Sequence, residues 1–498
     1  MLVQTRVASQ LRRQTDLGVS HELAVRPMSA WNRRKSIESI IAHAAGTNRL
    51  RPTLGGLQLV ALGVGAIVGT GIYTLTGVGA GLAGPGLILS FAIAGIVCAC
   101  AALAYTELST MMPVAGSAYT YSYVVLGELL AWIVGWSLIL EYTVVCSAVA
   151  VGWSGYAAGV IKAAGWGVPD ALLAGPEAGG IINLPAIVIS LAVAGLLALG
   201  TRESAAVNTV LVVVKLIALA TFIVLVLPAF DPSRFEPFMP YGFGAIEGAD
   251  GVKRGVMAAA ALVFFAFYGF DAVSTAAEET KNPSRDLQVG IIGSMVLCTL
   301  IYMAVGAAAL GASSYDVFSK SGEPLAFVMR SLGHPFAATL IAAAAVIALP
   351  TVILAFMYGQ SRIFFVMARD GLLPQRLAKV NERTGSPITM TVITGIIVAV
   401  IAGFLPLKSI AELANAGTLC AFVAVAACMM ILRKRDPARP RVFRTPWPWV
   451  VGPLAILGCL YLFLSLPGAT IVRFFIWNGL GLLAYAFYGR RRAALAAA

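Results

Sequence analysis

The sequence predicts an all-α polytopic membrane protein with twelve transmembrane helices. Three observations lead to this fold class: the composition, the number of long apolar stretches and the distribution of positive charge. Of the 498 residues, 59% are hydrophobic and only 12% are charged, whereas soluble globular proteins carry about 25% charged residues. The apolar surplus is therefore expected to face lipid rather than to fill one soluble core.

Twelve stretches are apolar enough to cross a bilayer, which takes about 20 residues as a helix. They are residues 55–80, 85–111, 127–160, 182–200, 204–230, 255–276, 287–312, 335–367, 388–404, 409–432, 448–466 and 469–488. The third and the eighth are long enough to be tilted or to continue past the bilayer.

The positive charges indicate the orientation of these spans. With the N-terminus inside, 26 of the 35 Lys and Arg residues fall on the cytoplasmic side and eight on the opposite side. Cytoplasmic loops carry such an excess, so both termini are predicted to be cytoplasmic. The same asymmetry explains the formal net charge of +12, and no nucleic acid is expected as a partner.

Residues 1–53 are predicted to form a basic cytoplasmic tail. They contain no apolar run of the kind that marks a signal peptide. Within the tail, residues 31–43 place Ile37, Ile40 and Ile41 on one helical face, which predicts an amphipathic helix on the cytoplasmic membrane surface. Residues 1–30 equally fit a partly disordered tail.

The first span contains an unusual run of glycines. Gly63, Gly65, Gly69 and Gly71 fall within nine residues, and each costs a helix about 1 kcal/mol relative to alanine. An unwound segment facing a cavity would explain them. Close packing of helices through small residues would explain them as well.

The sixth span has a second interruption, where Gly269 and Asp271 follow an aromatic run that begins at Phe264. A charged residue at the bilayer centre costs about 2.5–3.5 kcal/mol or more and is usually functional or paired. Interruptions in spans one and six are typical of two inverted five-helix repeats with a binding site between them. This correspondence favours unwound segments over packing glycines.

The repeats predict the organisation of the chain. Residues 54–230 would form the first repeat, with spans one to five, and residues 231–435 the second, with spans six to ten. Residues 436–498 would add two helices and a short basic tail.

A broken helix exposes binding groups in the middle of a membrane. The second half begins with free N–H groups, which favour an anion, and the first half ends with free carbonyls, which suit a cation. A molecule with adjacent carboxylate and ammonium groups fits both ends. An α-amino acid is the simplest such substrate.

Several segments resemble one family of transporters. GAIVGTGIY (65–73), FFAFYGFDAVSTAAEETKNPSRD (264–286) and GQSRIFFVMARDGLLP (359–374) resemble the amino acid–polyamine–organocation (APC) superfamily. The sequence is most similar to bacterial members of its cationic amino acid transporter family, and the resemblance spans residues 31–490 in order.

The resemblance implies a LeuT-like five-plus-five inverted repeat with broken helices 1 and 6, in the bacterial inner membrane. The substrate carboxylate would lie near Thr70 and Gly71, and its ammonium near carbonyls of Ile67 and the sixth span. Phe265 would also gate the site from outside. The implied substrate-binding residues are Ile67, Gly69, Thr70, Gly71, Phe265, Ala266 and Tyr268. The chain departs from the family pattern at Tyr268, where a smaller aliphatic residue is common, and at Pro350.

Three charged residues inside the spans are candidates for coupling or gating. Lys215 lies about 18 Å along the fifth span from its cytoplasmic end, too deep for its stem to reach the interface. Its position resembles that of a lysine that bridges the first and eighth spans in proton-coupled relatives. It acts either as a proton switch or as a fixed structural cation. Glu141 and Asp271 are the acidic candidates, and Glu141 would pair with a substrate cation, relay protons or cap a hydrogen-bond network.

Two acidic residues after the sixth span, Glu278 and Glu279, have arginines as candidate partners in the loop after the eighth span. They would form gating ion pairs with Arg362 and Arg369 or remain solvated charges, since exposed pairs are weak.

The sequence contains no catalytic, nucleotide-binding or metal-ligand motif, so neither an enzyme nor a cofactor or metal is expected. The predicted function is secondary active import of L-amino acids, cationic and/or neutral, by alternating access with proton symport. An amino acid exchanger and a non-transporting receptor on the same fold are the alternatives. The expected partners are an amino acid, a proton and membrane lipid, and the sequence identifies no small partner subunit.

Overall fold

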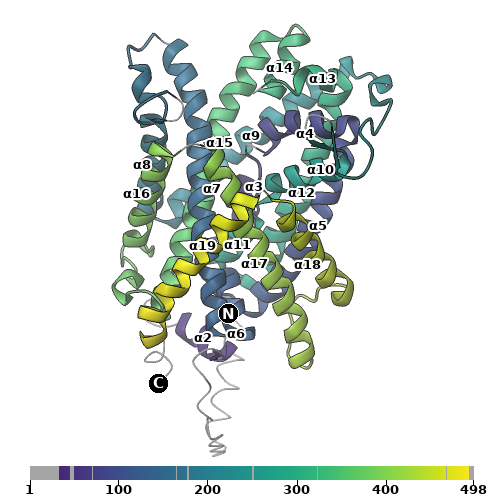
Figure 1. The fold of residues 1–498 in the computed structure, drawn as a ribbon. Coiled ribbons are helices and arrows are strands. Elements are labelled where there is room, and N and C mark those ends of the chain that lie inside the picture. The colour runs from purple at the N-terminus through teal and green to yellow at the C-terminus, as the bar shows by residue number, and fades with distance from the viewer. Residues whose placement is uncertain are drawn as a thin grey trace, which may run out of the picture.

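The computed structural model is an all-helical bundle with a marginal sheet (Figure 1). It describes residues 33–44, 50–69, 71–163, 165–176, 179–248, 252–321, 323–405, 407–466 and 468–492. In these ranges, eight helices are long and apolar enough to cross a membrane, and four shorter apolar helices accompany them. The prediction of a polytopic all-α membrane protein is therefore confirmed. The one sheet in the described ranges pairs β1 (Ile246–Glu247) with β2 (Lys253–Arg254).

Ten helices lie at ten of the predicted spans. They are α5 (Leu87–Met111), α7 (Glu128–Ala163), α8 (Leu184–Leu199), α9 (Thr201–Val226), α12 (Pro283–Ala312), α15 (Pro335–Arg369), α16 (Ile388–Phe404), α17 (Leu407–Arg435), α18 (Pro448–Leu464) and α19 (Gly468–Ala484). Their ends agree with the predicted ones to within a few residues.

The first and sixth spans are each broken, as their glycines predicted. The first consists of α3 (Gly56–Ile67), a π-helical turn η1 (Gly71–Leu75) and α4 (Thr76–Ala83). The sixth consists of α10 (Val256–Val263), a 3₁₀ turn η7 (Phe264–Phe267) and α11 (Phe270–Thr275).

Short helices in the connections were not predicted from the sequence. They are α6 (Ser117–Val125), α13 (Tyr315–Phe318) and α14 (Pro324–Ser331), with single turns η2 (Gly84–Gly86), η3 (Asp170–Leu172), η6 (Pro232–Phe235), η8 (Ala277–Glu279) and η9 (Gln375–Ala378). Two further turns, η5 (Leu227–Ala229) and η10 (Tyr485–Gly489), lie at the ends of the predicted fifth and twelfth spans. Figure 1 shows α13 and α14 at one end of the bundle, and α2 (Ile37–Ala44) and α6 at the other, which we call the α2 end.

Helix α2 is the described part of the predicted amphipathic helix. Ile37 and Ile40 are buried in the hydrophobic core of the protein, and Ile41 is 42% exposed. The main chain just before α2 is tied to α7, because the Glu128 amide donates to the Arg33 carbonyl at 2.8 Å. The apolar face of α2 therefore packs largely on the bundle. The predicted tail at residues 1–30 lies outside the described residues.

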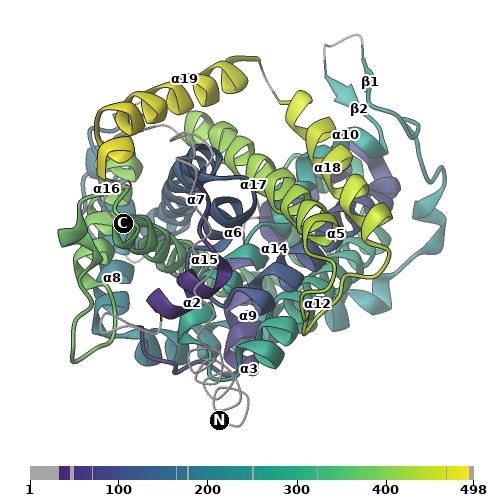
Figure 2. The ribbon, with the colours of Figure 1, turned by 90° about the horizontal axis from the view of Figure 1, so that it is seen from below.

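The two broken spans lie inside the bundle. Helix α12 packs on α3 and α5, and α7 packs on α15 and α17. Figure 2, the view from the α2 end, shows α18 and α19 at the rim with α17 inside them. The breaks are therefore surrounded by protein, which satisfies the condition for non-helical backbone at membrane depth.

Helix α15 continues through Pro350. Proline has no N–H, so the Val346 carbonyl loses its intrahelical donor. The indole N–H of Trp153 on α7 donates to that carbonyl at 2.8 Å. A side chain from a neighbouring helix therefore compensates for the proline.

The glycine run of the first span serves both close helix packing and the break in the helix, the two explanations considered from the sequence. Gly63 and Gly65 remain helical, and a Cβ atom there would lie 2.5 Å from Cβ of Ser294 and 2.7 Å from Oδ1 of Asn208, respectively. They permit close packing against α12 and α9. The helix ends at Ile67, so only the later glycines belong to the break.

Candidate functional site

The two breaks touch each other through reciprocal pairs of small residues. A Cβ atom on Gly71 would lie 2.6 Å from Cα of Ala266, and one on Gly269 would lie 2.9 Å from the carbonyl carbon of Ala66. Gly269 also has φ of +121°, a conformation that L side chains rarely adopt. The contact between the breaks therefore requires glycine at both positions.

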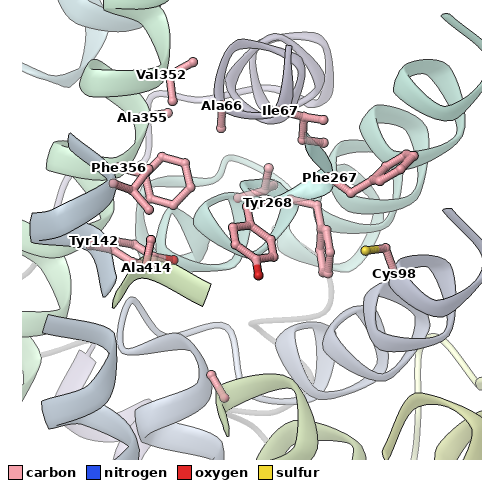
Figure 3. Packing of buried hydrophobic residues seen from close by; sticks show 14 of the residues in the cluster. Ala66, Ile67, Cys98, Tyr142, Phe267, Tyr268, Val352, Ala355, Phe356 and Ala414 are labelled. Atoms are coloured by element: carbon pink, nitrogen blue, oxygen red, sulfur yellow. The ribbon is translucent and has the colours of Figure 1, made fainter. Parts of the chain in front are cut away.

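A small cavity lies at this contact, with a volume of about 280 Å³ including its open part. Its walls come from both breaks, from α7 and from α15. The lining residues are Ala66, Ile67, Gly69, Gly71, Val145, Val149, Phe265, Ala266, Tyr268, Val352 and Phe356. Figure 3 shows Phe356, Val352 and Tyr268 around this region, and Phe267 directed away from it.

Six of the seven substrate-binding residues implied by the sequence line this cavity: Ile67, Gly69, Gly71, Phe265, Ala266 and Tyr268. Thr70 lies outside the described residues. Phe265 is half-buried, and its ring lies 5.4 Å from that of Tyr268, centroid to centroid. The two aromatic side chains thus form one wall.

Tyr302 on α12 connects the carbonyls at the two breaks. Its hydroxyl lies 2.6 Å from the Ile67 carbonyl oxygen and 2.9 Å from that of Ala266. A hydroxyl has one proton, and each carbonyl has two lone pairs. Both carbonyls thus retain capacity for a further donor. Tyr302 was not predicted as a site residue, since a lone tyrosine in an apolar span gives no signal in the sequence.

Lys215 is fully buried and joins three helices. Its ammonium donates to the carbonyls of Gly65 at 3.1 Å and Val68 at 2.6 Å, and to the Thr351 hydroxyl at 2.6 Å. The Thr351 hydroxyl in turn donates to the Gly65 carbonyl at 2.9 Å. The end of α3, α9 and α15 are thus connected through one cation, which does not line the cavity.

The acidic candidates lie apart from Lys215 and do not line the cavity. Glu141 on α7 is fully buried and accepts a hydrogen bond from Thr418 on α17. Its Oε2 atom accepts no hydrogen bond from the described residues. Asp271, also buried, accepts a hydrogen bond from Tyr142 on α7. Both carboxylates therefore lie at contacts of α7 with other helices.

Two ion pairs join the segment after α11 to α15. Glu279 and Arg362 are both fully buried and 3.0 Å apart, and the Arg362 guanidinium lies 3.8 Å from the ring centroid of Tyr358. Glu278 and Arg369 are 2.7 Å apart and also nearly buried. The interpretation of these acids as solvated loop charges is therefore wrong, because none of the four side chains is exposed.

Main-chain bonds reinforce this connection at the α2 end. The amides of Thr53 and Leu54 donate to the Glu279 carbonyl at 2.8 and 2.9 Å, and the Lys281 amide donates to the Leu54 carbonyl at 2.8 Å. The start of α3 is thus bound to the segment that follows α11. We call this set of three main-chain bonds the backbone bridge.

Breaking the buried ion pair should strongly destabilise the protein. Arg362→Met would leave the Glu279 carboxylate buried without its cation, and removal of one buried partner typically costs about 3–5 kcal/mol. We expect a lower melting temperature for the detergent-purified variant. The double variant Arg362→Met/Glu279→Gln should recover part of the lost melting temperature. Equal melting temperatures for wild type and Arg362→Met would contradict the structural importance of the pair.

The fold and the cavity define a class of protein: a multi-pass membrane protein with a small buried site between two broken helices. The family model for amino acid permeases matches residues 54–487. The chain belongs to this amino acid permease family, and the resemblance stated from the sequence is confirmed.

Three relatives indicate the range of the family. A branched-chain amino acid permease, BcaP, of Bacillus subtilis is 45% identical, over 93% of this chain and 98% of its own length. A methylthioribose transporter of Bacillus subtilis is 41% identical, over 94% of this chain and all of its own length. Cationic amino acid transporter 2 of Arabidopsis thaliana is 39% identical, over 81% of this chain and 63% of its own length. These relatives are permeases and transporters.

Proposed function

We propose that the protein imports a neutral L-amino acid with an apolar side chain, by alternating access and in symport with protons. It would do so across the bacterial cytoplasmic membrane, with twelve spans, two inverted repeats (residues 54–230 and 231–435) and both termini in the cytoplasm. The observation that carries the proposal is the cavity between the two breaks.

The lining of the cavity supports a neutral, apolar substrate side chain. Val145, Val149, Val352 and Phe356 form its wall on α7 and α15, and none of the described residues that line it carries a charge. A buried charge without a partner is costly, so a cationic substrate side chain would find no compensation here.

The main chain of the breaks supports recognition of the common part of an amino acid. Glycines at Gly69 and Gly71 leave the backbone accessible from the cavity. The carbonyls of Ile67 and Ala266 keep acceptor capacity beside the Tyr302 hydroxyl. A substrate ammonium would bind these carbonyls, and its carboxylate would approach the amides that follow Gly69.

Proton coupling is supported by the contacts of Lys215. A protonated lysine satisfies the carbonyls of Gly65 and Val68 and the Thr351 hydroxyl together. A neutral amine has fewer donors, so loss of the proton would weaken the connection between α3 and α15. The same contacts suit a permanently charged lysine, in which case the protein would be an exchanger.

Uptake by proteoliposomes tests the proposal. The panel should contain leucine, isoleucine, valine, arginine, lysine and methylthioribose, each with and without an inward proton gradient. We expect accumulation of apolar amino acids that depends on the gradient and is abolished by a protonophore. Accumulation of arginine or methylthioribose alone would refute the assigned substrate class, and transport that needs preloaded substrate would identify an exchanger.

A substitution in the cavity should alter substrate affinity in a predictable direction. Val149→Phe would fill part of the apolar wall, and a pocket typically discriminates about 10–200-fold for one methylene group. We expect the KM of the largest transported side chain to rise by at least about tenfold, with a smaller effect on valine. The matched control is Val213→Phe on α9, where the side chain is 50% exposed. Equal KM values for both variants would exclude this wall from the binding site.

A further inference from the structure

Tyr302 on α12 places a single proton between two main-chain acceptors. The residue is fully buried, and its hydroxyl oxygen lies 2.6 Å from the Ile67 carbonyl oxygen and 2.9 Å from the Ala266 carbonyl oxygen. A tyrosine hydroxyl has one proton to donate. It therefore satisfies one of the two carbonyls at a time, and the other contact brings lone pairs together at hydrogen-bond distance.

The two carbonyls belong to the two breaks. Ile67 is the last residue of α3, Ala266 lies in the turn η7, and both residues line the cavity between the breaks. Because both oxygens reach the same hydroxyl, they converge on one point. Among the side chains that the structure describes, that of Tyr302 is the donor to these oxygens. A ligand that brings several donors to this point would satisfy both carbonyls together.

The ring of Tyr302 is held on the side away from the cavity. It packs on Phe91 of α5 and on Phe267 of η7, with ring centroids 5.6 and 5.2 Å from its own. Figure 3 shows Phe267 directed away from the cavity, and Tyr302 does not belong to the residues that line it. The hydroxyl is thus fixed behind the two carbonyls, where a bound substrate does not displace it.

We propose that Tyr302 is a positioning residue that sets this pair of carbonyls for a primary ammonium group, and that it thereby makes the site select α-amino acids over α-hydroxy acids. The inference rests on the proposed function and assigns part of its specificity. An ammonium has three N–H donors and no lone pair, so it donates to both carbonyls while the tyrosine proton goes to one of them. The hydroxyl of an α-hydroxy acid has one proton and adds further lone pairs.

Tyr302→Phe tests the inference, because it removes the hydroxyl and keeps the ring that packs on Phe91 and Phe267. The matched control is Tyr461→Phe on α18, where the side chain is 44% exposed. Displacement of labelled leucine from the detergent-purified full chain gives dissociation constants for leucine and for its α-hydroxy acid analogue. The ratio of the two constants measures the preference for the ammonium group.

We expect Tyr302→Phe to weaken leucine binding by about tenfold or more, which is the typical effect of one hydrogen bond to a charged group. The α-hydroxy acid analogue should bind as it does to wild type and to Tyr461→Phe, which also shows that the variant is folded. Phe91→Leu keeps the hydroxyl but loosens the ring of Tyr302, so it should lower the preference by a smaller factor.

Two outcomes would overturn the role of Tyr302. An equal loss of affinity for both ligands would show that the tyrosine supports the walls of the cavity without selecting the ammonium group. Unchanged leucine binding in Tyr302→Phe would show that the carbonyls do not depend on its hydroxyl. A wild type that binds no amino acid of the uptake panel would instead refute the proposed function itself.

Discussion

Lys215→Met is expected to abolish gradient-driven accumulation of substrate. Methionine has a side chain of similar length but no charge and no donor. The Val68 carbonyl would lose the Lys215 donor, which lies 2.6 Å away, and a buried acceptor left unsatisfied costs about 1–3 kcal/mol. The Gly65 carbonyl would keep its bond from Thr351. The variant should therefore be less stable but folded.

Accumulation, counterflow and thermal stability should be measured together for this variant. We expect steady-state accumulation to fall to the level reached without a gradient, while counterflow remains measurable. Lys320→Met, at an exposed position, controls for loss of positive charge. If Lys215→Met still accumulates substrate in response to a gradient, the lysine is a fixed structural cation.

Gly269→Ala is expected to abolish substrate binding. A side chain at the φ of +121° is strained, by about 1–2 kcal/mol for the left-handed region. The new Cβ atom would also lie 2.9 Å from the carbonyl carbon of Ala66, and overpacking typically costs about 1–3 kcal/mol more. The backbone of α3 would have to shift, and Ala66 lines the cavity between the breaks.

The loss of substrate binding is measured as the loss of the increase in melting temperature that added substrate causes. Wild type should show such an increase and Gly269→Ala should show none, at a lower melting temperature. Gly479→Ala on α19 is the matched control, because a Cβ atom there meets nothing within 4 Å. A substrate-dependent shift of normal size in Gly269→Ala would mean that the contact between the breaks is not part of the site.

The sequence predicted the spans and the two breaks because their signals are local. Long apolar runs and clustered glycines are readable within a window of twenty residues, and the helix ends agree within a few residues. The short helix α6 (Ser117–Val125) was missed because its nine residues, all of them buried, are too few for a membrane span and show no amphipathic pattern.

The partners of the candidate residues were harder to predict than the residues themselves. Lys215 and Asp271 are conspicuous as charges in apolar runs. Tyr302, Thr351 and Asn208 are ordinary in a membrane helix, and their importance arises from contacts far along the chain, such as that of Lys215 with Gly65, 150 residues away. Such contacts depend on which helices become neighbours.

The backbone bridge between Leu54 and the Glu279–Lys281 segment has a consequence for how this protein evolves. Its bonds use amides and carbonyls that every residue except proline provides. Inherited substitutions at these positions therefore leave the bridge intact, while substitutions that line the cavity between the breaks change its shape. Natural variation can thus alter that cavity without disturbing the contact between the start of α3 and the segment after α11, and proline is the single replacement that it must avoid at the three donating positions.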